Sequence, residues 1–92
     1  MAYEWDEAKR QANIAKHGVD FTEAGTFQWP TAVTRNDRRR PYPEPRMESL
    51  GLIGSRLHVL VWTEPQPGVI RVISLRKANP RERKRYVRDY DA

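Results

Sequence analysis

The sequence predicts an α+β fold in which two N-terminal helices and a C-terminal helix pack on an antiparallel sheet of three to four strands. Three observations lead to this prediction. The first 24 residues show helical periodicity with clear start and stop signals. The middle of the chain alternates short apolar runs with turns rich in Gly and Pro. A second capped and charged segment closes the chain, so helical segments stand on both sides of the strands in sequence.

The first helix is predicted to run from a cap at Asp6 to His17, and Gly18 can adopt the left-handed conformation that ends a helix. An apolar stripe at the helical period consists of Trp5, Ala8, Ala12 and Ala15. A polar ridge beside it consists of Asp6, Lys9, Asn13 and Lys16, with Arg10 and His17 at its edge. We expect the C-terminal end of this ridge to take part in function and its inner part to hold the helix in place.

A second, short helix is predicted next, because Asp20 and Glu23 have the spacing of a capping box and Pro30 limits its length. Thr31–Thr34 is a weaker candidate for a strand. Tyr3–Trp5 either forms a short edge strand or is an apolar lead-in to the first helix.

Residues 36–45 are predicted to form an arginine- and proline-rich loop. Its three prolines at alternate positions exclude a regular helix or a paired central strand and favour an extended segment. This loop presents Arg38, Arg39, Arg40 and Tyr42. Three antiparallel strands follow, one ending near Gly51, one over Leu57–Thr63 and one over Val69–Leu75, with a hairpin loop at residues 64–68.

The last helix is predicted from strong N-terminal signals. Asn79 can cap it, Pro80 suits its first position, and Glu82 completes a capping box. We expect one side to face the sheet through Arg83, Tyr86, Val87 and Tyr90. The opposite face is expected to be wholly basic and consists of Arg81, Lys84, Arg85 and Arg88.

Length and composition bound the possible functions. The 92 residues suffice for a single domain, predicted to span residues 1–92, with one modest core. The net charge of +5 favours a polyanionic partner, which could be nucleic acid, an anionic membrane surface or an acidic protein. No apolar run is long enough to span a bilayer, and the N-terminus lacks the apolar core of a signal peptide. The absence of Cys excludes disulfides and thiolate catalysis, so we expect no metal or cofactor and a cytoplasmic location.

Three groups of side chains are candidates for phosphate chemistry. They are Lys9, Asn13, Lys16 and His17 on the first helix; Arg71, Ser74, Arg76 and Lys77 at the end of the last strand; and Glu82, Tyr86 and the arginines of the last helix. RNA can be cleaved without a metal when a base takes the proton of the ribose 2′-hydroxyl, an acid supplies one, and a cation holds the charge on the phosphoryl oxygens. His17 is the acid–base candidate, because imidazole titrates near neutrality. Arg76 or Arg71 can hold a phosphate with two donors.

Each candidate also has a purely structural interpretation. His17 can act as a C-terminal cation of its helix, and Asp6 and Glu82 can be caps. Tyr86 can belong to the core, and His58, inside an apolar strand, is expected to be structural. The residue pattern alone therefore indicates a basic α+β domain that meets nucleic acid, and it does not define a reaction.

Positions along almost the whole chain also match one family pattern in order. They are Trp5, Asp6, Lys9, Asn13, Lys16–Val19, Phe21, Ala24, Pro30, Ala32, Asp37, Glu44, Arg46, Leu50, Gly51, Thr63, Arg71, Ile73, Ser74, Arg76–Ala78, Glu82 and Tyr86. On these residues the chain resembles the BrnT-type toxins, small bacterial ribonucleases of type II toxin–antitoxin pairs. The resemblance implies a fold like that of the RelE and ParE toxins.

The resemblance further implies a metal-independent endoribonuclease that cleaves RNA and arrests growth. The catalytic candidates are then Lys16, His17, Arg76, Glu82 and Tyr86. The RNA-binding candidates are then Lys9, Arg38, Arg39, Arg40, Arg71, Lys77, Arg81, Lys84, Arg85 and Arg88. The implied partners are RNA and a BrnA-type antitoxin with a ribbon-helix-helix half, through which the complex binds operator DNA. Two alternatives stay open: a non-catalytic module that binds nucleic acid or antitoxin, and a ParE-like poison of a protein target.

The chain departs from the family pattern at three places. Family members often have a histidine in the loop near the position of Arg40, so this protein must do without that imidazole or use His17. Glu64 follows Thr63 where an arginine is common, which lowers the local positive charge. Leu75 replaces the usual alanine before the Arg76 position, which indicates different packing under the basic cluster.

Overall fold

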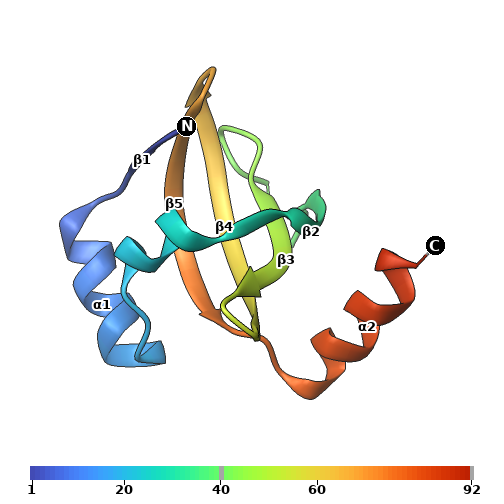
Figure 1. Cartoon of the computed structure of the whole chain (residues 1–92). Helices are drawn as coiled ribbons and strands as arrows, with labels where there is room; N and C mark the ends of the chain where they lie inside the picture. The colour runs from blue at the N-terminus through green and yellow to red at the C-terminus, as the bar shows by residue number, and fades with distance from the viewer. Residues whose placement is uncertain (40, 92) are drawn as a thin grey trace.

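The computed structural model describes residues 1–39 and 41–91 of the chain. The elements in order are β1 (Ala2–Glu4), α1 (Glu7–His17), the 3₁₀-helix η1 (Phe21–Thr26), β2 (Gln28–Asn36), β3 (Met47–Ile53), β4 (Arg56–Gln66), β5 (Val69–Lys77) and α2 (Pro80–Tyr90) (Figure 1). The strands form one sheet in the order β1-β5-β4-β3-β2. The α+β class is confirmed, whereas the predicted sheet of three to four antiparallel strands is wrong in detail. There are five strands among the described residues, and β1 runs parallel to β5.

The two strands that add to the three antiparallel ones predicted in the second half of the chain are β1 and β2, which are the two edge strands of the sheet. Of the two interpretations of Tyr3–Trp5, the edge strand is the correct one, since Tyr3 pairs with Ile70. The Thr31–Thr34 candidate is part of the longer β2, which includes Pro30. Proline is tolerated there because β2 is an edge strand and its register shifts between Gln28 and Val33.

The hairpin between β4 and β5 is tighter than predicted. β4 continues through Pro65 to Gln66, so the turn is reduced to Pro67 and Gly68. Gly68 has φ of +81°, a left-handed conformation that glycine adopts without steric cost.

Helix α1 begins and ends as predicted, but it packs through a different face. Asp6 accepts hydrogen bonds from the Ala8 and Lys9 amides at 2.8 and 3.2 Å, and Gly18 closes the helix with φ of +71°. The alanines of the predicted apolar stripe (Ala8, Ala12 and Ala15) are exposed, so that expectation is wrong. The buried residue of the helix is Asn13.

Asn13 attaches α1 to the sheet through the backbone. Its Nδ2 donates to the carbonyls of Leu75 at 2.7 Å and Val19 at 2.9 Å, and its Oδ1 accepts from the Leu75 amide at 3.2 Å. β1 pairs with β5 at Val69–Arg71, and the Asn13 amide continues the hydrogen bonding farther along β5. A polar side chain occupies this buried place because it replaces a neighbouring strand.

The second predicted helix is a 3₁₀-helix rather than an α-helix. The reciprocal capping box of Asp20 and Glu23 is present as expected. Only six residues lie between the cap and Phe27, and short connecting segments of this kind commonly adopt the tighter 3₁₀ form. Arg10 joins η1 to α1, because its guanidinium donates to both Asp20 carboxylate oxygens at 2.8 Å.

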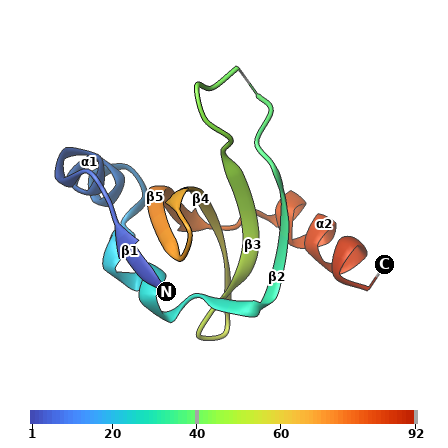
Figure 2. The same ribbon diagram turned by 90° about the horizontal axis from the view of Figure 1, so that it is seen from above.

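Two apolar clusters lie on opposite faces of the sheet, since neighbouring side chains along β4 alternate between them. One cluster, with α1 and η1, consists of Val19, Phe21, Ala24, Phe27, Leu60, Val72 and Leu75. The other consists of Leu50, Leu57, Val59, Val61 and Ala78, with Tyr86 packed against it. Figures 1 and 2 show α1 beside β5 and α2 near β2, at opposite ends of the molecule.

Helix α2 has the predicted caps but an unexpected orientation. Asn79 and Glu82 form the capping box. Val87 and Tyr90, expected to face the sheet, are 62% and 51% exposed. Arg85, expected on the solvent side, has a side chain only 15% exposed because it pairs with a carboxylate on β3. No residue of α2 is buried, so polar contacts carry much of its attachment.

None of the described helices has both the length and the apolar character needed to cross a membrane.

Candidate functional site

The second face of the sheet carries a buried carboxylate that holds two arginines. Arg35 of β2 and Glu48 of β3 are cross-strand partners, and Arg35 Nε donates to Glu48 Oε1 at 3.0 Å. Arg85 of α2 donates to the same oxygen at 2.7 Å. The Glu48 side chain is only 9% exposed. Glu48 therefore fixes guanidinium groups from two elements that are far apart in sequence.

Arg76 at the end of β5 is held by two parallel hydrogen bonds to one carboxylate. Its Nη1 and Nη2 donate to the two carboxylate oxygens of Glu82 at 2.8 and 2.7 Å. Glu82 also accepts from the Asn79 amide at 2.9 Å as part of the cap of α2. The hydrogen bonds between the two side chains raise the pKa of Arg76 and lower the pKa of Glu82. The same carboxylate thus caps the helix and orients the arginine.

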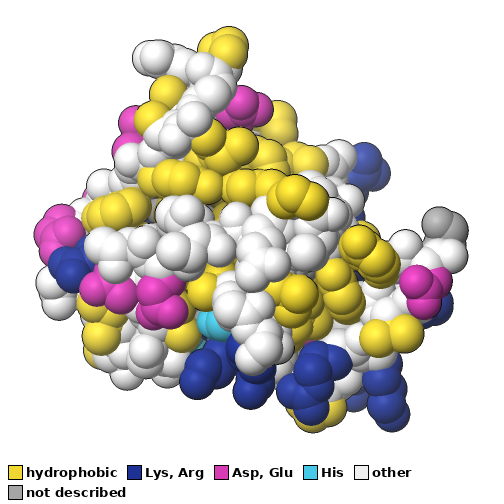
Figure 3. All heavy atoms as spheres, viewed as in Figure 1, with side chains coloured by type: hydrophobic (Ala, Val, Ile, Leu, Met, Phe, Trp, Pro, Cys, Tyr) yellow, Lys and Arg dark blue, Asp and Glu magenta, His cyan; other side chains and the backbone are white. Residues whose placement is uncertain are grey.

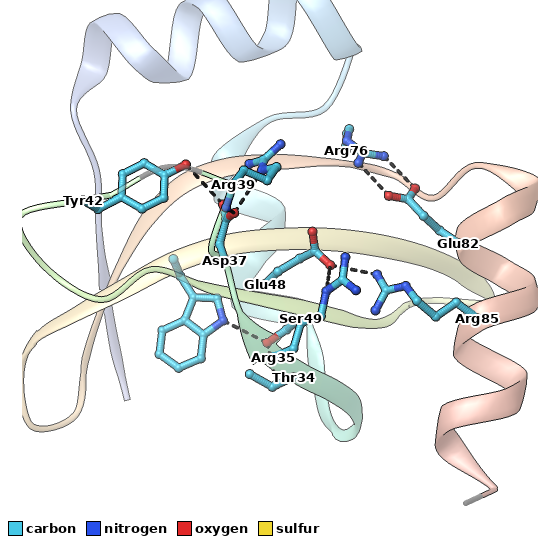
Figure 4. Close-up of polar contacts among 11 residues, drawn as sticks. Thr34, Arg35, Asp37, Arg39, Tyr42, Glu48, Ser49, Arg76, Glu82 and Arg85 are labelled. Atoms are coloured by element: carbon cyan, nitrogen blue, oxygen red, sulfur yellow. Dashed lines mark hydrogen bonds and ion pairs between the residues drawn. The ribbon is translucent and has the colours of Figure 1, made fainter.

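A third arginine comes from the β2–β3 loop. Arg39 Nε and Nη2 donate to the two oxygens of Asp37 at 2.9 and 2.8 Å. The Asp37 side chain is 1% exposed, and its pKa is lowered, mainly by the hydrogen bond from Arg39. The charges of Arg39 and Glu48 both act on the pKa of Arg76, after the larger effect of Glu82. Figure 4 shows the Arg39–Asp37 pair, the Arg76–Glu82 pair at the start of α2, and Glu48 near Arg35 and Arg85.

These groups form what we call the arginine cluster, which consists of Arg35, Arg39, Arg76 and Arg85 with Asp37, Glu48 and Glu82. Four guanidiniums face three carboxylates, so the cluster keeps an excess of positive charge. Exposed cations continue this charge along the neighbouring edge, and Figure 3 shows Lys and Arg side chains gathered there. Exposed cations of the elements that meet near the cluster are Lys16 at the end of α1, Lys77 at the end of β5, and Arg81 and Lys84 on α2. Such a surface suits the phosphates of a nucleic acid strand.

His17 lies in the last turn of α1 and is only partly exposed. Its pKa is lowered by burial and then by the positive charges of Lys16 and Arg76. The effect of Arg76 indicates that the end of α1 lies within electrostatic range of the arginine cluster. A lowered pKa keeps the imidazole neutral at physiological pH, so that it can accept a proton.

Several predicted site residues lie apart from the cluster. Lys9 is exposed, Arg71 pairs with Glu4 at 2.6 Å, and Arg88 pairs with Asp89 at 2.9 Å. Arg38, by contrast, is exposed and lines a hollow together with Arg35, Arg39 and Glu48 of the cluster. Arg40 lies outside the described residues.

Two other predicted candidates are held by backbone groups. The Tyr86 hydroxyl donates to the Thr31 carbonyl at 2.6 Å, and burial raises the pKa of Tyr86. Its position fits a tether between α2 and β2. His58 is buried and its Nδ1 contacts the Arg56 carbonyl at 2.9 Å, which agrees with the structural role expected for it.

Arg35, Asp37 and Glu48 were missed as site residues by sequence reasoning. Glu48 carried a usable signal, because it lies in phase with Leu50 and Leu52 of the same strand, and a carboxylate on such an apolar face needs a partner. Arg35 became its partner only through the register of β2, which the sequence defined poorly. In the described part of the chain, no three His, Asp or Glu side chains are grouped so that they could hold a metal ion.

Comparison with known proteins decides the family. Residues 5–82 match the sequence profile of the family described as "Ribonuclease toxin, BrnT, of type II toxin-antitoxin system". The chain belongs to the BrnT family. The resemblance inferred from the sequence is thereby confirmed. Family membership makes it a BrnT-like ribonuclease toxin of a type II toxin–antitoxin system.

A solved structure agrees with this assignment. The chain is similar to the Brucella abortus ribonuclease toxin BrnT, known from a crystal structure at 1.1 Å resolution, with 28% sequence identity and a TM-score of 0.67. The similarity covers 86% of this chain and 99% of the Brucella chain. The comparison with curated proteins found no matching relative. The BrnT profile ends at Glu82, so most of α2, including Arg85, lies beyond it.

Proposed function

We propose that this BrnT-family chain is an endoribonuclease that cleaves RNA at the arginine cluster without a metal ion. The observation that carries the proposal is the convergence of Arg39, Arg76 and Arg85 on one face of the sheet, each held by a carboxylate. In the proposed reaction the ribose 2′-hydroxyl attacks the adjacent phosphorus, and the bond to the 5′-oxygen breaks. The leaving 5′-oxygen takes up a proton from water, so the products are a 2′,3′-cyclic phosphate and a 5′-hydroxyl. Preorganised guanidiniums stabilise the charge that develops on the phosphoryl oxygens.

Arg76 is the proposed phosphate ligand. Its planar fork already binds two oxygens of Glu82, and a phosphate presents two oxygens with similar geometry. Glu82 would position this fork and give way to the substrate. Arg39 and Arg85 would flank the phosphate, while Lys16, Lys77, Arg81 and Lys84 would bind the neighbouring strand.

His17 is the proposed general base for the 2′-hydroxyl. Burial and nearby cations lower its pKa, so the imidazole is free to accept the proton near neutral pH. Lys16 would assist by its charge, and Tyr86 would act indirectly by tethering α2 to β2.

The test is to incubate purified protein with RNA in the presence of a chelator and to analyse the product ends. We expect cleavage with 2′,3′-cyclic phosphate and 5′-hydroxyl termini. Activity that disappears in chelator and returns with added divalent cation would disprove the metal-independent mechanism. Salt-dependent RNA binding without cleavage would instead favour a non-catalytic binding module.

We further propose that the toxin acts in the cytoplasm and is neutralised there by a BrnA-type antitoxin with a ribbon-helix-helix half, which also brings the complex to operator DNA. The family's pairing with an antitoxin and the positive charge of the chain support this proposal. Expression of the toxin alone should arrest growth, and co-expression with the adjacent open reading frame should restore it. Arrest with intact RNA and a trapped topoisomerase would point to a ParE-like target instead.

A further inference from the structure

Helix α2 has a second side that the proposed RNA site does not use. Glu82 and Arg85 face the arginine cluster, whereas Val87 and Tyr90 are exposed. With Met1 they are the large apolar side chains that stand out as exposed among the described residues. Exposed apolar side chains that lie together commonly mark a binding surface.

Val87 lines a groove between α2 and the β3–β4 hairpin. The groove has a volume of about 490 Å³, and its apolar floor consists of Leu52, Leu57, Tyr86 and Val87. A second hollow, formed by Pro80, Arg83, Lys84 and Val87, continues it along the helix. Arg83 and Val87 line both hollows, so the hollows adjoin, and we refer to them together as the groove along α2. Figure 3 shows apolar side chains on the visible surface between the sheet and α2.

The charged residues around this groove have one sign. Arg56, Arg83 and Lys84 line it, and no carboxylate does so within the described part of the chain. A second copy of this chain would bring these cations against like charges. A nucleic acid backbone would satisfy the cations but would leave the apolar floor without a partner. An acidic amphipathic protein segment satisfies both features.

We propose that this groove binds an acidic, amphipathic segment of the protein antitoxin. Apolar side chains of that segment would cover Val87, Leu52 and Leu57, and its carboxylates would pair with Arg83, Arg56 and Lys84. The identity of the partner as an antitoxin rests on the proposed function. The groove lies on the side of α2 away from Arg76, so antitoxin binding does not use the proposed phosphate ligand, and Lys84 is the one groove cation that also belongs to the proposed RNA surface.

The test uses Val87→Asp in the full chain. Val87 is 62% exposed, so the substitution should not disturb folding, which circular dichroism can verify. We expect its affinity for the purified product of the adjacent open reading frame to fall at least about tenfold, as for a central interface residue. Cleavage of RNA by the free variant should remain unchanged. The control is Arg88→Glu, which places a new negative charge on the same helix outside the groove and should keep the affinity for the antitoxin.

Three results would overturn the proposal. Unchanged antitoxin affinity of Val87→Asp would remove the groove from the interface. Simultaneous loss of RNA cleavage in a folded variant would assign the groove to RNA. A wild-type dimer that Val87→Asp converts to a monomer, with antitoxin affinity retained, would assign it to a second copy. If the wild-type chain binds antitoxin through Val87 but does not cleave RNA, the proposed reaction fails and the docking site stands.

Discussion

The two α-helices are attached to the sheet by different kinds of contact. Helix α1 is held by the neutral amide of Asn13, buried against the backbone of β5, and by the Arg10 link to η1. Helix α2 has no buried residue and is held by Arg76–Glu82, by Arg85–Glu48 and by the Tyr86 hydroxyl. The buried Asn13 contacts of α1 offer no group that an anionic ligand could take over. The ion pairs of α2 expose groups that an anionic ligand can take over.

The two attachments differ in whether their groups could also bind a substrate. Neutral hydrogen bonds to the backbone have no counterpart in the substrate, whereas guanidinium forks bind carboxylate and phosphate in the same geometry. Substitutions at the α1 attachment should therefore lower stability, and substitutions at the α2 attachment should lower activity.

The largest expected effect is that of Arg76→Ala. Loss of the phosphate fork should lower the rate of RNA cleavage about 10²–10³-fold, as for removal of a preorganised oxyanion ligand. Arg76→Lys should recover only part of the rate, because an ammonium supplies charge without the fork. Single-turnover cleavage assays measure both variants. The control is Arg83→Ala, which removes an arginine from the other side of α2 and should cleave RNA at the wild-type rate. Equal losses of cleavage rate in Arg76→Ala and Arg83→Ala would contradict a defined phosphate site.

The next effect is on stability. Asn13→Ala leaves the Leu75 amide and two buried carbonyls without their partner, so the free energy of unfolding should fall by about 2–4 kcal/mol. Urea denaturation measures this change. Gln11→Ala, at an exposed position of the same helix, should change stability by less than about 0.5 kcal/mol. A folded Asn13→Ala protein with normal stability but no RNase activity would reverse the comparison between the two helices.

A smaller loss of stability is expected at the start of α1. Asp6→Ala removes the side chain that accepts from the Ala8 and Lys9 amides, which should cost about 1 kcal/mol. Asp6→Asn should retain most of that stability, because Asn is also a good N-cap. His17→Ala and Lys16→Ala, at the other end of the helix, should leave the midpoint of denaturation nearly unchanged. If Asp6→Ala instead abolishes cleavage at full stability, Asp6 belongs to the site.

The smallest effect concerns pH. The pKa of His17 lies below its ordinary value of about 6.5, so the acid limb of the cleavage profile should have its midpoint below that pH. Lys16→Ala removes a positive charge that lowers this pKa, so the limb should move towards higher pH. The shift can be measured from cleavage rates across about pH 4–8, the range in which a perturbed imidazole titrates. A limb that persists unchanged in His17→Ala would exclude this residue as the base.

The elements that could be predicted are those defined by local chemistry. The caps Asp6, Gly18 and Asn79 and the apolar run of β4 depend on near neighbours, and all were identified. The packing face of α1 was mispredicted because a periodicity count treats Asn13 as a polar, exposed residue. Such a count cannot detect that the backbone of β5 satisfies the Asn13 amide. The exposure of Val87 escaped prediction for a related reason, since α2 is oriented by ion pairs with distant strands.

The candidate site was predictable to a similar extent. Arg76 and Glu82 lie six residues apart around a recognisable cap, and the sequence indicated both. Glu48 and Arg35 meet across two strands joined by a long loop, so their contact depends on the register. Arg85 was identified as a cation, but on the wrong side of its helix.

The double role of Glu82 makes substrate binding and the integrity of α2 parts of one equilibrium. If a phosphate replaced Glu82 at the Arg76 guanidinium, as proposed, it would release the carboxylate that also accepts from the Asn79 amide. In the proposed reaction the first turn of α2 would then lose its link to β5 at the moment when the substrate is bound. By thermodynamic linkage the relation is reciprocal, so a ligand that stabilises the start of α2 weakens the affinity of Arg76 for phosphate by the same factor. A ligand in the groove along α2 can therefore inhibit without touching the scissile bond.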